Sequence, residues 1–284
     1  MIEPASRPTS SDVARHYDEL DFFYRDVWGE HIHHGVWTGE SDDASVRTAT
    51  LRLLFLAVQP LRLVPRQDVA DIGCGYGSAS RWLAETFGVN VTGVTLSPAQ
   101  AAEAHHHAAP SRGSVCCRVT DWLDNQLPSA TFDAAIAIES LAHMPDKQRF
   151  FDELKRTLKP GGKAAIACWL AAGDPTRLEQ KLLEKICDEG RIPGMGTIEE
   201  YLGMARRSGL HVAGHRDLSR EVERTWRVIA RRLLAAAVTR KEYAISLLNR
   251  AFRERLFLLT LPRLMLAYHT GAIRYGLIWL ERAP

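Results

Sequence analysis

A glycine-rich turn is the stretch of this sequence best suited to hold a ligand. In Asp71–Gly77 three glycines alternate with other residues, after an apolar approach and before a helix-compatible run over residues 78–87. Glycine lets the main chain turn sharply with no Cβ in the way, and the helix that follows offers unpaired N–H groups. We therefore expect a flat, polar ligand to lie against Gly73 and Gly75.

A nicotinamide dinucleotide fits this turn less well than other nucleotides. The dehydrogenase fingerprint spaces its glycines as G-x-G-x-x-G and places an acidic residue about 20 positions later, for a ribose hydroxyl. Here the spacing is G-x-G-x-G, and Thr95 stands where the acid is expected. Because Thr95 can still bond a ribose, a nucleotide-dependent oxidoreductase stays open as an alternative.

Four further segments follow the turn in a familiar order, at 93–100, 120–122, 132–135 and 158–162. Together with the turn they resemble the class I S-adenosylmethionine (SAM) methyltransferases, over about residues 14–170. Residues 28–37 and 139–147 are similar to the tocopherol C-methyltransferase group and to related bacterial natural-product methyltransferases. The resemblance implies SAM as cofactor and a doubly wound α/β fold with a seven-stranded, mostly parallel sheet.

The order of expected elements supports this fold without the resemblance. Strand-like segments at 68–72, 89–95, 114–119, 133–138 and 163–168 are each separated by a helix-sized segment. Such alternation indicates a parallel, doubly wound sheet whose ligand lies outside the carboxyl ends of the strands. The landmark segments lie at those ends.

We expect one methyltransferase domain with three parts: an N-terminal helical flap (1–65), a SAM-binding core (66–170), and lid helices with a terminal strand hairpin (171–284). Asp12 is the expected N-cap of the flap helix, after a mobile tail over 1–11. The lid is expected to be an insertion made of helices over 174–190 and 197–208. The resemblance implies the hairpin, from strands at 210–218 and 272–280.

The resemblance also implies cofactor contacts at ten positions. These are Tyr17, His33, Asp71, Gly73, Gly75, Thr95, Gln100, Asp121, Trp122 and Glu139. Tyr17 and His33 are assigned to the methionine end of SAM, Thr95 and Gln100 to the ribose or methionine portion, and Asp121 and Trp122 to the adenine. Simple packing of the rings, and turn capping by Asp71, are the alternatives.

Methyl transfer from a sulfonium is an in-line displacement, so positioning dominates its catalysis. Orientation of the reactants supplies roughly 7–11 kcal/mol in favourable cases, whereas acid–base help is about 10²- to 10⁴-fold. His143 and Glu139, on the loop after the fourth strand, are the predicted catalytic bases. Alternatively, His143 only bonds backbone, and Glu139 binds the SAM amino group.

Aromatic residues are frequent in the flap and lid segments and favour an apolar or prenylated acceptor. We therefore predict methylation of a small, largely apolar specialised metabolite, with carbon slightly favoured over oxygen or nitrogen. A SAM-binding module without catalytic activity is a further alternative. Cyclopropane fatty acid synthases, which are also similar, carry Glu directly before the loop histidine. Ala142 occupies that position here, which disfavours lipid cyclopropanation.

Two features of the C-terminal third leave their function open. A basic stripe on one predicted helix face suits a phosphate-bearing substrate, an acidic partner or plain solvent; it comprises Arg220, Arg224, Arg227 and Arg231. An apolar set suits a substrate chamber or an oligomer interface; it comprises Phe252, Leu256, Leu259, Leu266 and Tyr268.

Composition limits where the protein is expected to work and which partners it is expected to have. The chain has 284 residues, a net charge of +2 and five scattered cysteines, with no apolar N-terminal segment typical of a signal peptide. We expect a cytoplasmic protein with reduced thiols, no nucleic-acid partner, no stable membrane insertion and a possible homo-oligomer. The cluster His31–His34 has no Cys or carboxylate pair at ligand spacing, and the side chains of His105–His107 splay around an expected helix and cannot share one ion. Cys116 and Cys117 are expected to be buried or half-buried.

Overall fold

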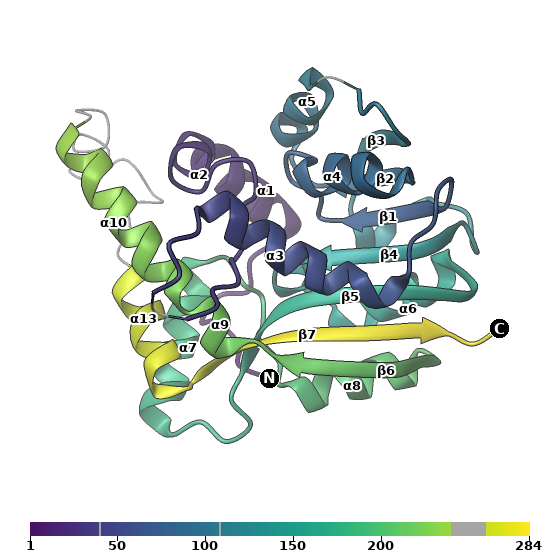
Figure 1. Ribbon diagram of the computed structural model, residues 1–284. Helices are drawn as coiled ribbons and strands as arrows, with labels where there is room; N and C mark the ends of the chain where they lie inside the picture. The colour runs from purple at the N-terminus through teal and green to yellow at the C-terminus, as the bar shows by residue number, and fades with distance from the viewer. Residues whose placement is uncertain (40, 108, 240–259) are drawn as a thin grey trace.

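The protein is built on a seven-stranded sheet with the order β3-β2-β1-β4-β5-β7-β6. The computed structural model describes residues 1–39, 41–107, 109–239 and 260–284 (Figure 1). Strands β1 to β5 are parallel, and β7 is antiparallel to both of its neighbours. The predicted mostly parallel sheet is therefore confirmed. The strands are β1 (Asp68–Ile72), β2 (Asn90–Thr95), β3 (Ser114–Val119), β4 (Phe132–Ile138), β5 (Leu158–Ala171), β6 (Leu210–Asp217) and β7 (Ile273–Arg282).

Strand β5 is longer than predicted at both ends, and its pairing with β7 carries it three residues past the predicted end at 168. The pairing runs from Lys163 opposite Glu281 to Ala171 opposite Ile273. The expected hairpin at this edge is present as β6 and β7. An amide ladder with a partner far away in sequence sets the length of β5, so a local apolar pattern cannot reveal it.

Helices cover both faces of the sheet. On one face lie α3 (Val46–Val58) and α4 (Ser78–Phe87), while α5 (Pro98–His106) packs on β3. On the other face lie α6 (Lys147–Thr157) and α8 (Ile198–Arg207). Thr197 caps α8 as predicted. However, α8 packs against α6 and β6 instead of forming part of a lid.

Two short helices form the N-terminal flap beside the carboxyl edge of the sheet (Figure 1). They are α1 (Ser10–Glu19) and α2 (Asp21–Val27). Asp12 is not the N-cap of α1. Thr9 takes that position, and Asp12 closes a capping box with it as the third residue of the helix.

The first residues of the chain are not a loose tail. Ile2 forms an isolated antiparallel bridge with Met195, in which each N–H donates to the other carbonyl at 2.8 Å. The Ile2 side chain is buried in the main core. The expectation of a mobile segment over 1–11 was based on Pro and Ser content and missed this pairing.

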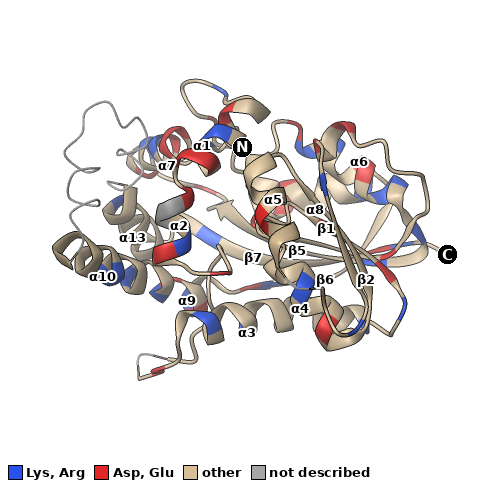
Figure 2. Ribbon diagram, turned by 90° about the horizontal axis from the view of Figure 1, so that it is seen from above, with Lys and Arg blue, Asp and Glu red and all other residues tan. Residues whose placement is uncertain are grey.

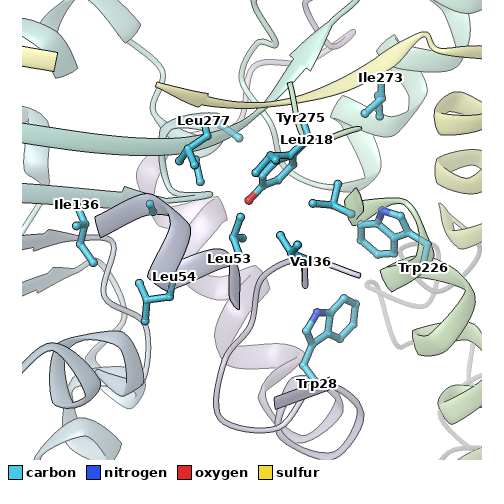
Figure 3. Close-up of a cluster of buried hydrophobic side chains, with 14 of the residues drawn as sticks. Trp28, Val36, Leu53, Leu54, Ile136, Leu218, Trp226, Ile273, Tyr275 and Leu277 are labelled. Carbon is cyan, nitrogen blue, oxygen red and sulfur yellow. The ribbon is translucent and has the colours of Figure 1, made fainter. Parts of the chain in front are cut away.

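A second group of helices gathers at the same end of the molecule as the flap (Figure 1). It consists of α7 (Arg177–Glu189), α9 (Ser219–Val222), α10 (Arg224–Thr239) and α13 (Thr260–Thr270). Their apolar faces join the flap and α3 in one core, which Figure 3 shows with Trp28 and Trp226 facing aliphatic side chains and Tyr275. No helix in the described part of the chain is both long and apolar enough to cross a bilayer.

The predicted basic stripe does not lie on one continuous helix, because the helix breaks between Val222 and Arg224. Arg224 stacks on the Trp37 ring at 4.9 Å and donates to the Gly39 carbonyl at 2.7 Å. Arg227 and Arg231 are exposed on α10, where Lys and Arg positions are blue in Figure 2. Of the predicted apolar set, Phe252, Leu256 and Leu259 lie outside the described residues.

Candidate active site

One cavity lies at the carboxyl ends of the parallel strands, beneath α1. All ten positions predicted to contact the cofactor line it, and so does His143. They are Tyr17, His33, Asp71, Gly73, Gly75, Thr95, Gln100, Asp121, Trp122 and Glu139. The structure therefore brings together every predicted site residue, because the loops after parallel strands meet at one edge and the N-terminal segment with Tyr17 and His33 covers that edge. Their individual roles stay predictions.

The glycine turn has the conformation that the sequence requires. Gly73 and Gly75 have φ angles of +80° and +53°. A Cβ on Gly73 would lie 2.3 Å from the Cβ of Ser140, whereas a Cβ on Gly75 would meet nothing within 4 Å. Packing therefore requires glycine at position 73. At position 75 the open space leaves room for a ligand against the main chain.

Asp71 lies buried under this turn and accepts a hydrogen bond of 2.6 Å from the Ser80 hydroxyl on α4. Burial raises the pKa of Asp71 to about 6, against the opposing effect of the Ser80 hydrogen bond. A positive charge that enters the cavity would therefore lower the pKa of this carboxyl group.

Polar groups follow the next two strands, at the positions predicted to contact a ribose and an adenine. The Thr95 hydroxyl donates to the Gln100 side-chain carbonyl at 2.9 Å, and both residues are buried. One oxygen of Asp121 accepts from the Leu123 N–H at 2.9 Å. Trp122 is only 2% exposed, and its indole N–H donates to the Phe150 carbonyl at 3.4 Å. These contacts agree with simple packing of the Trp122 ring, which is the alternative to an adenine contact.

His33 has an unsatisfied acceptor inside the cavity. Its Nδ1–H donates to the His34 carbonyl at 2.8 Å, so Nε2 carries the lone pair. Nε2 is buried and has no hydrogen-bond partner. Burial lowers the pKa of His33, which keeps the ring neutral. A donor on a bound ligand, such as an ammonium group, would satisfy this atom.

His143 and Tyr17 form a hydrogen-bonded pair. His143 Nδ1–H donates to the Arg191 carbonyl at 3.2 Å, which leaves Nε2 to accept from the Tyr17 hydroxyl at 2.9 Å. Burial lowers the pKa of His143 to about 4. The imidazole is therefore neutral at pH 7. Its basic nitrogen, Nε2, faces the Tyr17 hydroxyl.

A buried lysine, which the sequence analysis missed, supports the His143 loop. Lys147 donates to the carbonyls of Leu141, Ala142 and Met144 at 2.7–2.8 Å. Burial lowers the pKa of Lys147 to about 7. These three carbonyls belong to the short turn around His143, so the ammonium group fixes the position of the imidazole.

Glu139 is bonded to the protein on both carboxylate oxygens. Oε1 accepts from the His34 N–H at 2.7 Å, from His34 Nδ1–H at 2.9 Å and from the Tyr275 hydroxyl at 2.8 Å. Oε2 accepts from the Trp169 indole at 3.1 Å. Burial alone raises the pKa of Glu139, but the charge and hydrogen bonds of His34 outweigh it and hold the pKa at about 2. This environment favours an anchoring role over that of a base.

The flap is joined to four loops of the carboxyl edge by side-chain hydrogen bonds, which we call the flap contacts. They join Ser10 to Asp121 at 2.8 Å, Tyr17 to His143 at 2.9 Å, Asp18 to Ser97 at 2.5 Å, and Asp21 to Tyr76. The four loops follow β1, β2, β3 and β4 in turn. Ser10, Tyr17 and Asp18 are spaced for one face of α1, which is a signal in the sequence, whereas Asp21 belongs to α2.

The remaining cavity wall is aromatic. Tyr24, Trp28, Trp169 and Trp226 line it, and the Trp226 ring lies 5.7 Å from both other indoles, edge to face. Among the residues that the structure describes, no Lys or Arg lines the cavity. Nor do three or more His, Cys, Asp or Glu come together there to hold a metal ion, as far as the described chain extends.

The two adjacent cysteines differ in burial. Cys117 is buried, as expected, but Cys116 is exposed, contrary to expectation.

A doubly wound sheet with a glycine turn and a covered cavity at its carboxyl edge is the arrangement of a nucleotide-binding site. The model of the mycolic acid cyclopropane synthetase family matches residues 5–259, and the chain belongs to this family. The tocopherol O-methyltransferase of Arabidopsis thaliana is 31% identical over 288 residues, which cover 95% of this chain and 81% of the relative.

Two further similarities agree with this class. The 27-O-demethylrifamycin SV methyltransferase of Amycolatopsis mediterranei is 32% identical over 230 residues, covering 80% of this chain and 84% of the relative. The solved structure of the mycolic acid cyclopropane synthase CmaA1 has a TM-score of 0.84 at 23% identity, covering 98% of this chain and 99% of that one. That second likeness shows the fold. The protein is thus an enzyme that uses SAM.

Proposed function

We propose that the enzyme methylates an uncharged, apolar acceptor, namely a hydroxylated aromatic ring with a prenyl-like chain. Carbon is the first candidate for the methylated atom and oxygen the second. The observation that carries this proposal is the aromatic cavity wall without a described Lys or Arg. The tocopherol and rifamycin relatives add support, since neither of their names refers to a phosphate-bearing acceptor.

The charge of the lining argues against an anionic acceptor. A diphosphate needs Arg or Lys donors or a bound metal ion to replace its hydration. An anion held beside aromatic rings, with no cation to pair with it, would lose several kcal/mol of solvation without compensation. Geranyl diphosphate is therefore a useful negative probe, because it has a prenyl chain but also two phosphates.

The residues at the glycine edge suit the parts of SAM. His33 Nε2 would accept from the ammonium group, and the open face of Gly75 would lie against the methionine and ribose. Thr95 and Gln100 would bond the ribose, and Asp121 would accept from the adenine amino group. When bound, SAM supplies an electrophilic methyl group on its sulfonium.

Tyr17 and His143 provide a path for the proton that the acceptor loses. An acceptor hydroxyl placed against the Tyr17 oxygen can pass its proton there as the Tyr17 proton moves to His143 Nε2. Loss of this proton makes both the phenol oxygen and its ortho carbon nucleophilic. The same first step therefore serves methylation of either atom.

Methyl-labelled SAM tests the proposal with three acceptors: a prenylated hydroquinone, a catechol without a chain, and geranyl diphosphate. We expect label in the hydroquinone, less in the catechol and none in the diphosphate, with NMR of the product locating the methyl group. Tyr17→Phe and His143→Ala should lower turnover about 10²- to 10⁴-fold while SAM affinity is kept.

Tyr201→Phe is the matched control, because the Tyr201 hydroxyl is also buried and hydrogen-bonded but bonds the Gly196 N–H outside the cavity. This variant should keep its turnover. Methylation of geranyl diphosphate ahead of the hydroquinone would refute the neutral acceptor. Failure to label either neutral acceptor, with SAM bound, would refute the proposed acceptor class.

A further inference from the structure

Two thiols lie in contact beneath the glycine turn. The Sγ atoms of Cys74, in the turn, and Cys117, on β3, are 3.4 Å apart. Each residue is 8% exposed, and Cys74 lines the SAM cavity. The proposed methyl transfer uses neither thiol.

The neighbouring residues leave room for this contact. Cys117 pairs with Gly93 in the register of β2 and β3, and Cys74 lies over that glycine. A Cβ on Gly93 would be 2.8 Å from the Cys74 sulfur, so a larger residue would push the thiol away. The pair also packs with the small side chains of Ala101 and Ala104 on α5.

We propose that Cys74 and Cys117 form an oxidation site at which a peroxide creates a disulfide that weakens SAM binding. In the first step one thiolate attacks a peroxide oxygen, which gives a sulfenic acid and releases hydroxide, or alkoxide from an organic peroxide. In the second step the other thiol displaces water from the sulfenic acid and the S–S bond forms. Two thiols are oxidised, and one peroxide is reduced.

The geometry favours this reaction. The side-chain hydrogen bond from Cys74 lowers the pKa of the Cys117 thiol, which makes the thiolate more available at that position. The resolving thiol is already in contact, so no segment has to unfold. Since Cys74 lines the cavity, a small peroxide has a route to the pair, and bound SAM would block that route.

A disulfide would disturb the SAM site directly. An S–S bond is about 2.05 Å long, so the sulfurs must approach by more than 1 Å from their separation of 3.4 Å. Cys74 stands between Gly73 and Gly75, and the Cβ space at Gly73 is already filled by Ser140. The turn therefore cannot absorb the movement on that side. We expect at least about a tenfold loss of SAM affinity, which corresponds to about 1.4 kcal/mol.

The first experiment treats the native protein with hydrogen peroxide and measures its intact mass and its SAM affinity by calorimetry. The expected results are loss of two hydrogens, a joined pair of the tryptic peptides 67–81 and 113–118, and weaker SAM binding that dithiothreitol restores. Saturation with SAM beforehand should slow the cross-link. Absence of the linked peptides, or a cross-link that leaves SAM affinity unchanged, would overturn the proposal.

Variants identify the sulfur, because peptide 113–118 contains both Cys116 and Cys117. Cys117→Ser should give no linked peptides and keep its SAM affinity under peroxide. The matched control Cys116→Ser should behave like the native chain. If Cys116→Ser abolishes the cross-link and Cys117→Ser does not, the assignment to the buried pair is wrong. The mass readout on the native chain holds even if one variant folds poorly.

Discussion

Removal of one flap contact should speed the exchange of SAM. The Asp18 carboxylate on α1 accepts from the Ser97 hydroxyl at 2.5 Å. Asp18→Ala is the cleanest change, because Ser97 also caps α5 by accepting from the Gln100 N–H, and this cap survives. Substitution of Ser97 itself would weaken two features together.

The expected size of the effect follows from the bond type. A hydrogen bond to a charged group contributes about 1.5–3 kcal/mol when buried. The Asp18 contact is only part-buried, so we expect about 1–2 kcal/mol, or roughly a fivefold to thirtyfold change in the opening equilibrium of the flap. If the flap is closed both with and without SAM, opening limits entry as well as exit. Association and dissociation rates should then rise together.

Stopped-flow displacement of SAM by its demethylated product measures the dissociation rate, and calorimetry measures the dissociation constant. We expect the rate to rise roughly fivefold to thirtyfold and the dissociation constant to change by less than about threefold. Glu19→Ala is the matched control, an acidic position on the same helix with no described hydrogen bond to the cavity loops. Its rates should equal those of the native enzyme.

Two results would refute this reasoning. An unchanged dissociation rate in Asp18→Ala would mean that the flap does not limit exit. A weaker affinity with an unchanged association rate would mean that Asp18 acts only on the bound state. The first result leaves the observed hydrogen bond without a kinetic role, and the second converts it into part of the cofactor site.

Three further predictions concern buried charge. Burial raises the pKa of Asp71 to about 6, and a bound cation lowers it, so SAM binding at pH 6 should release about half a proton. Calorimetry in buffers of different ionisation enthalpy measures this release, which Asp71→Asn should abolish. Lys147→Met deprives three carbonyls of their donor and should lower the free energy of unfolding by about 2–4 kcal/mol. Urea titration measures that loss, and SAM turnover should fall more than SAM affinity. Burial lowers the pKa of His31 to about 3 and that of His143 to about 4, both below the unfolded value of 6.5. Their contribution to stability is therefore present above pH 6.5 and lost as the pH falls through the folded values, by about 5 kcal/mol for His31 and about 3 kcal/mol for His143. Urea titrations at pH 7 and pH 4.5 check the sign, and a flat profile would contradict it.

The sequence predicts most of the cofactor edge because local rules are enough there. Alternation of strand and helix forces the loops of parallel strands to one edge, so the neighbourhood of Gly75, Thr95 and Asp121 follows from chain order alone. The glycines of the turn can also be predicted from the sequence, because their backbone conformations exclude most other residues.

Other parts of the site could not be predicted, because they depend on contacts between distant segments. The Tyr275 hydroxyl that bonds Glu139 comes from a residue 136 positions away. Nothing near Glu139 in sequence indicates that its oxygens are already occupied. The capping box at α1 is a different case. Thr9 and Asp12 bond each other reciprocally, so the pattern marks the helix start but not which of the two residues caps it.

The flap contacts and the cofactor positions share the same loops, and this overlap couples closure to binding. Ser97 is two residues beyond Thr95, Tyr76 follows Gly75, and Asp121 belongs to both sets. A ligand that orders a loop therefore also orders an anchor of the flap. A change in a loop should likewise disturb the flap. A cross-link at Cys74 would move the turn that carries Tyr76 and would weaken the hydrogen bond between Tyr76 and Asp21 on α2. Oxidation of the thiol pair should then raise the dissociation rate of SAM as well as weaken its direct contacts, and the displacement assay applied to oxidised enzyme separates these two effects.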